Sequence, residues 1–130
     1  YREVMSNLKV ANINIKVRDL FFKWVEITKP FHRLSHQQQQ VLALFLYQHY
    51  TLKKEITNEK ILWKIVFEYD TKVSIKKELN MKDAGFQNIM YQLRKKNVIK
   101  NGRISPMYIP ELSKDSNNFK IVFNFNIIDG

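Results

Sequence analysis

The sequence predicts an α+β fold in which a bundle of helices is followed by a small antiparallel β-sheet. Two observations lead to this prediction. Apolar residues recur at helical spacing in several segments between residues 19 and 96, as they do on the buried face of an amphipathic helix. The turn sequence Lys100-Asn101-Gly102-Arg103 then joins two short extended segments, and asparagine followed by glycine is a preferred two-residue hairpin turn.

Residues 1–34 are predicted to form an extension made of a strand and a short helix. Apolar and polar residues alternate over residues 11–17, which is the pattern of a strand with one buried face. Asp19 is placed to cap the helix, and Pro30 ends it because the residue before a proline is pushed out of the helical region. Three aromatic residues crowd this helix and either pack against the C-terminal strand or form a dimer contact: Phe21, Phe22 and Trp24.

Two further helices are predicted from their starting residues. Ser35 and Gln38 have the spacing of a capping box, in which side chain and backbone bond each other reciprocally at the start of a helix. The helix that follows is apolar on most sides between residues 41 and 50, so we expect it at the centre of the bundle. Asn58 is a favourable N-cap for a third helix that reaches Tyr69.

Residues 75–99 predict two helices joined by a tight turn. Ile75 and Leu79 lie four residues apart on one helical face, and Met81 supplies an apolar residue for the turn. Asn80 and Asn97 follow the two expected helices, and asparagine tolerates the left-handed backbone that such helix ends require. The second helix, residues 82–96, is expected to bury four apolar side chains: Phe86, Ile89, Met90 and Leu93.

Beyond the hairpin the sequence predicts two more extended segments. Pro106 and Pro110 bracket the first one, and the polar residues 113–118 are expected to form a loop. Residues 119–127 alternate apolar with mostly polar side chains, which predicts a C-terminal strand. In this strand Phe119, Phe123 and Phe125 are expected to face the core.

The segment from Ile75 to Ile99 resembles the winged helix-turn-helix superfamily of bacterial, plasmid and phage regulators and replication proteins. It shows the superfamily's paired apolar residues, turn residue, recognition helix and closing apolar pair without a gap, over about a fifth of the chain. The resemblance implies one winged-helix domain over residues 1–130, with its core in residues 35–130 and the hairpin as its wing. The sequence departs from the pattern at its two asparagine turns, where glycine is more usual. It departs again at Asp83-Ala84-Gly85, where DNA-binding members more often carry Ser, Thr or Arg.

Charge is concentrated around the predicted recognition helix. The chain has 22 Lys and Arg against 12 Asp and Glu, a net charge of +10. Between Thr71 and Arg103 nine basic residues face only Glu78 and Asp83, a local charge of +7. Such an excess favours a polyanionic partner, because lysine and arginine release counterions when they bind phosphates. The nine are Lys72, Lys76, Lys77, Lys82, Arg94, Lys95, Lys96, Lys100 and Arg103.

The exposed face of the recognition helix supplies the candidate DNA contacts. Glutamine and asparagine can bond adenine, and arginine can bond guanine, in the major groove. Base contacts are therefore expected from Gln87, Asn88, Tyr91 and Arg94. Phosphate contacts, which fix the register of the protein on DNA, are expected from Lys76, Lys77, Lys82, Lys95, Lys100 and Arg103. Asp83 is expected to repel phosphates, whereas Gly85 would permit a close approach of the backbone to a groove.

We therefore expect a double-stranded DNA-binding protein without catalytic activity, acting as a transcriptional regulator or a replication-initiation factor. Its expected location is the cytoplasm of a bacterial or phage-infected cell, in association with the nucleoid. The alternative is a winged-helix module for protein interaction or assembly, such as a phage structural or DNA-packaging component. The Asp83-Ala84-Gly85 segment and the apolar N-terminal extension favour that alternative. A homodimer and a phage or replication protein are candidate partners.

Several other functions lack the residues they require. The chain has no cysteine and only three glycines, so neither a thiolate metal site nor a glycine-rich phosphate loop is expected. His32 and His36 are four apart, but Pro30 and Ser35 place His32 outside the helix, so no metal site is expected.

Two carboxylate pairs, Glu55 with Glu59 and Glu68 with Asp70, flank helix ends, so no catalytic residue and no cofactor is expected. The longest apolar run, Val41 to Tyr47, is far shorter than the roughly 20 residues of a membrane helix. No apolar secretion segment with a cleavage site appears at the start of the sequence.

Overall fold

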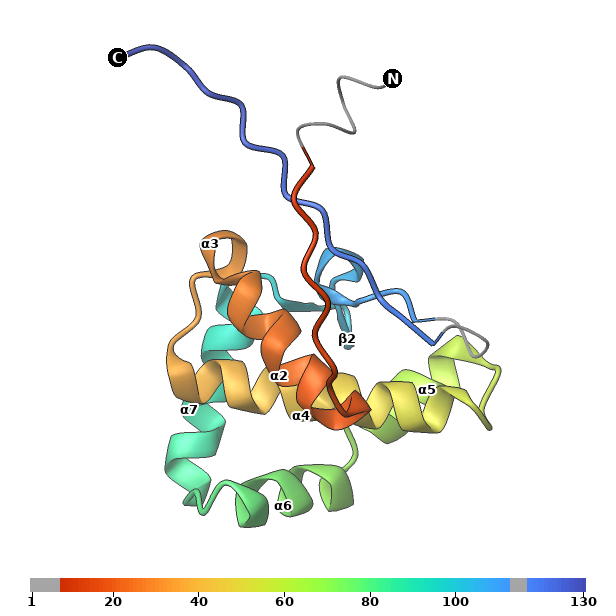
Figure 1. Ribbon diagram of the computed structural model, residues 1–130. Coiled ribbons are helices and arrows are strands. Elements are labelled where there is room, and N and C mark those ends of the chain that lie inside the picture. Colours follow the sequence, from red (N-terminus) through yellow and green to blue (C-terminus); the bar gives the residue numbers. More distant parts are fainter. Residues whose placement is uncertain (1–7, 113–116) are drawn as a thin grey trace.

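Residues 8–112 and 117–130 are described by the computed structural model (Figure 1). Within these ranges the chain forms helices and one two-stranded antiparallel sheet, which confirms the predicted α+β class. In the same residues no helix combines the length and the apolar character that crossing a bilayer requires.

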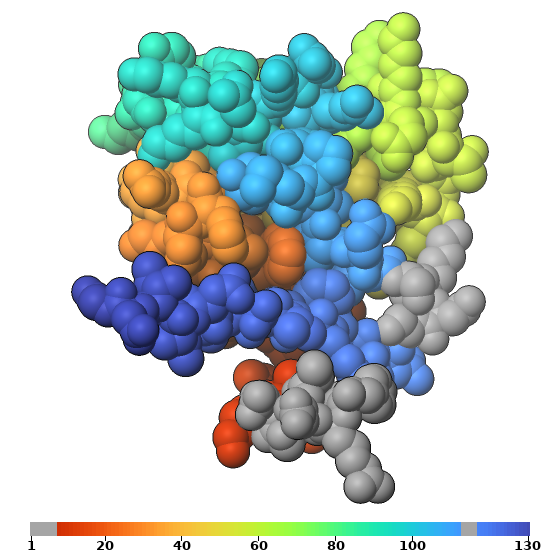
Figure 2. All heavy atoms as spheres, turned by 90° about the horizontal axis from the view of Figure 1, so that it is seen from above, coloured from red at the N-terminus to blue at the C-terminus, as the bar shows by residue number. Residues whose placement is uncertain are grey.

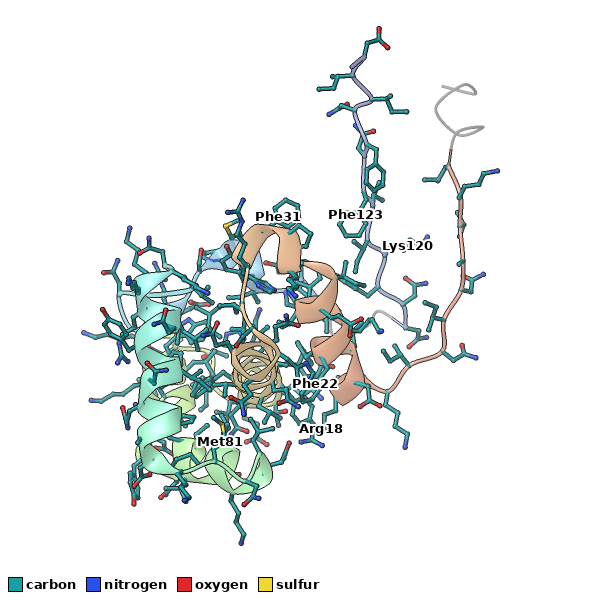
Figure 3. All side chains as sticks on the ribbon, turned by 90° about the vertical axis from the view of Figure 1, so that its left-hand side faces the viewer. Arg18, Phe22, Phe31, Met81, Lys120 and Phe123 are labelled. Atoms are coloured by element: carbon teal, nitrogen blue, oxygen red, sulfur yellow. The ribbon has the colours of Figure 1, made fainter. Side chains whose placement is uncertain are left out.

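Helix α4, His36–Lys53, lies at the centre of the bundle, as predicted. Its capping box is present, because Gln38 N donates to Ser35 Oγ at 3.3 Å and Ser35 N donates to Gln38 Oε1 at 3.0 Å. Six consecutive residues, 41–46, are buried, which requires neighbours on more than one side. Figure 3 shows α4 end-on between α7 and α2, with α6 below it.

Helix α2, Val17–Ile27, covers one side of α4 and buries Phe21 and Val25. It ends before Pro30, as predicted, and the Thr28 hydroxyl donates to the Trp24 carbonyl at 2.8 Å. The predicted Asp19 cap is wrong. The helix begins at Val17 with no side-chain cap, so Asp19 lies in its first turn, where a carboxylate still favours the positive end of the helix dipole.

A short helix, α3, Lys29–His32, links α2 to α4 and ends at Arg33, which has a left-handed φ of 55°. Helix α5, Glu59–Val66, begins at the predicted cap, with Ile61 N donating to Asn58 Oδ1 at 3.0 Å. It ends at Val66 rather than near Tyr69, which instead begins α6, Tyr69–Glu78.

Helices α6 and α7, Asp83–Lys95, end in the same motif at the two predicted asparagines. Asn80 and Asn97 have φ of 52° and 60°. After α6, Met81 N donates to Lys76 O at 2.8 Å, and after α7, Val98 N donates to Leu93 O at 2.9 Å. These are Schellman bonds, which satisfy carbonyls that the helix end leaves open. The burial of residues 86, 89, 90 and 93 by α7 is also confirmed.

Strands β1, Ile99–Lys100, and β2, Arg103–Ile104, form the predicted hairpin. Asn101 and Gly102 both have positive φ, 56° and 74°, as a two-residue type I′ turn requires. The extended segment predicted between Pro106 and Pro110 is wrong, because Pro106–Tyr108 form the 3-10 helix η1. Proline at its start is compatible with that helix, since the first turn needs no N–H donor there.

Both predicted terminal strands are wrong. Residues 8–16 and 119–130 are extended but pair with no described strand, so the alternation of the sequence has no sheet to join. Phe123 and Phe125 are exposed rather than in the core, and only Phe119 is half-buried, with its ring centroid 5.8 Å from that of Trp24. Of the predicted loop at residues 113–118, residues 113–116 lie outside the described residues.

Candidate nucleic-acid interface

Helix α7 buries one face and exposes the other along its whole length. Because residues three and four apart lie on one side of a helix, one exposed face carries Gln87, Asn88, Tyr91, Arg94 and Lys95. The ammonium of Lys95 lies 6.0 Å from the centroid of the Tyr91 ring. The structure therefore brings all four predicted base-contacting side chains onto one exposed surface, with a lysine beside the tyrosine.

The hairpin adds two cations next to this helix. Lys100 and Arg103 are opposite each other in the strand register and both are exposed, whereas Ile99 and Ile104 are paired and buried. Figure 2 shows α7 (teal) and the hairpin (light blue) on one side of the molecule, away from the terminal segments (red and dark blue). We call the exposed residues of α7, its N-cap Lys82 and the hairpin pair the basic face.

The start of α7 carries an ion pair that the sequence did not predict. Lys76 Nζ on α6 binds Asp83 Oδ1 on α7, and the same ammonium lies 5.8 Å from the Phe86 ring centroid. The Lys76 side chain is only 17% exposed, against 81% for Asp83. The Asp83 charge is thus offset locally, and of the six predicted phosphate contacts Lys76 is the one that is already occupied.

The remaining predicted phosphate contacts are more accessible. In the described part of the chain Lys77, Lys82, Lys95, Lys100 and Arg103 are exposed and form no ion pair. Glu78, the second acidic residue of the basic segment, binds Arg18 of α2. The local positive potential is therefore less opposed than the sequence count suggests.

Lys96 has a structural role, whereas the sequence predicted only its contribution to the local charge. Its ammonium donates to the Arg33 carbonyl at 3.1 Å and lies 3.4 Å from Gln38 Oε1 of the α4 capping box. It therefore ties the C-terminal end of α7 to the start of α4. No sequence signal predicts this role, because it depends on the left-handed conformation of Arg33, and arginine is not a residue that favours that conformation.

Gly85 lies on the exposed side of the first turn of α7. A Cβ atom built there meets no heavy atom within 4 Å, and its φ is not positive. Neither the packing nor the backbone of the chain therefore requires glycine, although glycine costs about 1 kcal/mol relative to alanine within a helix. An absent side chain here leaves room for a partner to approach the helix backbone.

Two histidines are buried away from the basic face. Leu34 N donates to His32 Nδ1 at 2.9 Å, and His32 Nε2 lies 2.6 Å from the Val25 carbonyl, so Nε2 carries the proton. Burial lowers the pKa of His32, and so do the nearby cations Lys96 and Lys29, against the hydrogen bond to Val25.

His49 stacks on Trp63, with the ring centroids 4.2 Å apart, and its Nε2 has no partner among the described residues. Its pKa is also lowered, chiefly by burial. Both imidazoles are therefore neutral parts of the core.

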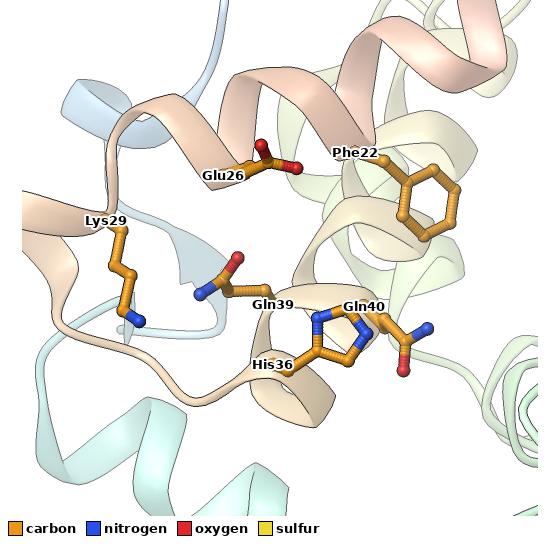
Figure 4. Close-up of a pocket in the computed structure, with 6 residues that line it drawn as sticks. All are labelled: Phe22, Glu26, Lys29, His36, Gln39 and Gln40. Atoms are coloured by element: carbon orange, nitrogen blue, oxygen red, sulfur yellow. The ribbon is translucent and has the colours of Figure 1, made fainter.

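A hollow of about 270 Å³ lies between α2, α3 and α4 (Figure 4). His36 lines it beside Glu26 and Lys29, while the buried His32 points elsewhere, so the two histidines do not converge. Across residues 8–112 and 117–130 no three histidine or acidic side chains gather to hold a metal ion. The four residues of the two carboxylate pairs, Glu55 with Glu59 and Glu68 with Asp70, are all exposed.

Comparison with known proteins adds no family to this description. No protein-family model, curated protein or solved structure gives a significant match to the chain. The winged-helix resemblance of residues 75–99 therefore stays a prediction, and the chemistry of the basic face is what supports a function.

Proposed function

We propose that this chain is a winged helix-turn-helix protein that binds double-stranded DNA, with α7 as recognition helix and the β1–β2 hairpin as wing. One observation carries the proposal. The exposed face of α7 presents amide side chains, which can form two hydrogen bonds to one base, together with cations, and it lies beside a hairpin whose exposed pair is Lys100 and Arg103. Contact with water alone would account for a charged helix face, but it would not account for a cationic hairpin beside that face on the same side of the molecule.

The dimensions of α7 suit the major groove. Its 13 residues span about 20 Å, and the groove, about 12 Å wide, admits a helix. Gln87 and Asn88 lie in its N-terminal half, where recognition helices contact base edges. Lys82 at the start of the helix and Lys95 at its end are placed for the phosphates on either side, and Lys100 and Arg103 for those beside the wing.

A salt series of duplex DNA affinities tests this proposal. We expect the logarithm of the affinity to fall linearly with the logarithm of salt concentration, and Lys95→Glu and Lys100→Glu each to weaken binding to all sequences and to reduce the slope by about 1. The matched control is Lys60→Glu on α5, which makes the same charge change at an exposed site distant from α7 (Figure 1). Undetectable binding at low salt, or an equal effect of all three reversals, would refute the proposal.

Base contact requires a different variant. We expect Gln87→Ala to relax the preference at one base pair by about 1–3 kcal/mol while leaving the salt slope unchanged. Selection of bound sequences from a random duplex library, with the parent and the variant in parallel, measures this preference. An unchanged selected motif would remove Gln87 from the base-contacting set. We propose a regulator or replication-initiation factor acting on the nucleoid as the biological role of such binding.

A second function is favoured by the exposed apolar side chains of the terminal segments. The chain would then be a winged-helix assembly module, for instance in a phage particle or packaging machine. In such an assembly, neighbouring proteins would cover both these side chains and the basic face. Light scattering of the purified protein with and without duplex DNA separates the two functions. A large assembly that shields Lys95 from chemical modification and excludes DNA favours assembly over DNA binding.

A further inference from the structure

The two terminal segments carry apolar side chains that the body of the protein does not cover. We call residues 8–16 the N-terminal arm and residues 119–130 the C-terminal arm. Phe125 is 83% exposed and Ile127 is 94% exposed, and Val10 and Ile13 are also mostly exposed. Exposed apolar side chains concentrated in this way mark an interaction site more often than singly scattered ones do.

Both arms have the alternating sequence of a β-strand, and the backbone of both is extended but not paired with another strand. The N-terminal arm contains Asn12-Ile13-Asn14-Ile15, and the C-terminal arm contains Asn124-Phe125-Asn126-Ile127, so each alternates asparagine with a large apolar residue. No backbone hydrogen bond joins residues 8–15 or 119–130 to another described residue. Their N–H and C=O groups are therefore open to a β-ladder.

The arms leave the same side of the body. Figure 1 shows the N-terminal arm running down past α2 to the start of that helix and the C-terminal arm running up and away from the body, so the two run in opposite directions. The C-terminal arm is held at its root by the contact between Phe119 and Trp24 and continues outward past Phe123 (Figure 3). Strands in this arrangement can pair antiparallel.

Pairing within one chain does not suffice. It would give a two-stranded ribbon standing off the body with both faces in water, and such a ribbon is at best marginally stable. Three or more strands with a covered apolar face are needed for stability. Two copies of the chain supply four arms, which is enough strands without any other protein.

We infer that the arms of two copies combine into one intermolecular β-sheet, so that the occupant of the exposed apolar surface is a second copy of this chain. In this sheet Phe125 and Ile127 of one copy pack against the apolar side chains of the other. The arms themselves carry few charges that the association would have to bring together: the C-terminal arm has one cation and one anion, Lys120 and Asp129, and the N-terminal arm has Lys9 and Lys16.

The apolar area is also sufficient. The two arms of one copy carry nine large apolar side chains at exposed positions, and burying each removes roughly 90 Å² from water. The total is about 800 Å² for each copy, which is the size of a standard stable interface.

Sedimentation equilibrium of the full chain measures the inference directly. We expect the mass of two chains at micromolar concentration, and Phe125→Asp should reduce the mass to that of one chain. The matched control, Ile61→Asp, places the same charge at an exposed apolar site of α5 and should stay dimeric. Since the C-terminal arm beyond Phe119 lies outside the core, circular dichroism should show both variants folded. A monomeric parent, or a Phe125→Asp variant that remains dimeric, would overturn the inference.

The absence of cysteine from the sequence permits a second measurement. A single cysteine at Asn126→Cys leaves the apolar residues intact, and a short bismaleimide should join two copies through it. Lys60→Cys, at an exposed position of α5 outside both arms, should give no covalent dimer under the same conditions. Failure of Asn126→Cys to cross-link would count against a sheet shared by two copies. A monomer that still binds duplex DNA would overturn only the arm inference, because the arm variants leave the basic face unaltered.

Discussion

Replacing Gly85 with alanine separates what this residue costs the fold from what it offers a partner. The added Cβ meets no atom of the chain within 4 Å, and the backbone there is helical with no positive φ. The substitution therefore brings no clash, and it reduces the conformational freedom of the unfolded chain. We expect the free energy of unfolding to rise by about 0.5–1 kcal/mol, which corresponds to a Tm about 2–4 °C higher for a chain of this size.

Duplex DNA affinity should change in the opposite direction. If the backbone of α7 approaches the groove at Gly85, an inserted methyl group costs about 1–3 kcal/mol of misfit, or roughly 5- to 150-fold in affinity. The two quantities are measured on the same preparation, by thermal unfolding and by fluorescence anisotropy of a labelled duplex at fixed salt. Few substitutions raise the stability of a fold and also weaken its binding. A higher Tm together with a lower affinity would therefore indicate that the α7 backbone lies close to the DNA groove at Gly85.

The neighbouring residue provides the matched control. Ala84→Gly removes a methyl group at an adjacent exposed position, so it should lower the Tm by a similar amount and add no steric obstacle to DNA binding. A Gly85→Ala variant that is more stable and binds DNA as tightly as the parent would refute the close approach. A variant that is less stable would contradict the structural description of an open site.

Three further predictions concern charge, backbone and pH. Asp83→Asn should raise duplex DNA affinity several-fold in a gel-shift assay, because it removes an anion from the start of α7 and releases Lys76. The Asp83 side chain is 81% exposed, so water screens the ion pair; it contributes less than about 1 kcal/mol and the Tm should barely move. Asn97→Ala should lower the free energy of unfolding by about 1 kcal/mol in urea titrations while Asn97→Gly should not, because φ is 60° at that residue; equal effects would contradict the left-handed helix end. Burial lowers the pKa of His32 and His49 below the ordinary 6.5, so the unfolded chain binds protons first. Stability should therefore be full above about pH 6.5 and fall as the pH drops through it toward the folded-state pKa values, and a flat urea midpoint between about pH 7.5 and pH 5.5 would contradict this.

The features that could be predicted from sequence depend on neighbouring residues alone. Ser35 and Gln38 are three residues apart, and each supplies what the other's backbone lacks, so their capping box forms whatever packs nearby. The same holds for the two asparagines that end α6 and α7 and for the Asn101-Gly102 turn. Each of these residues adopts a positive φ that its own residue type tolerates.

The features that could not be predicted depend on partners distant in sequence. Alternation over residues 119–127 shows which side chains would share a face, but a strand also needs another strand to pair with, and the described residues offer none. Arg18 and Glu78 are 60 residues apart, and nothing in either local sequence indicates their contact. The Lys76–Asp83 pair is an intermediate case, because its residues are close in sequence but meet only through the geometry of the turn at Asn80.

The Asp83-Ala84-Gly85 segment, which from sequence weighs most against DNA binding, has a different meaning once its surroundings are known. Asp83 does not present an unopposed charge, because Lys76 neutralises it from the preceding helix. Phosphates at this end of α7 would therefore meet a nearly neutral pair together with Lys82, rather than a repulsive carboxylate. Gly85 serves no requirement of the fold. A helix start whose charges are balanced and whose residues 84 and 85 are small suits close approach to a crowded surface, and the affinity of Gly85→Ala decides whether that surface is the DNA groove.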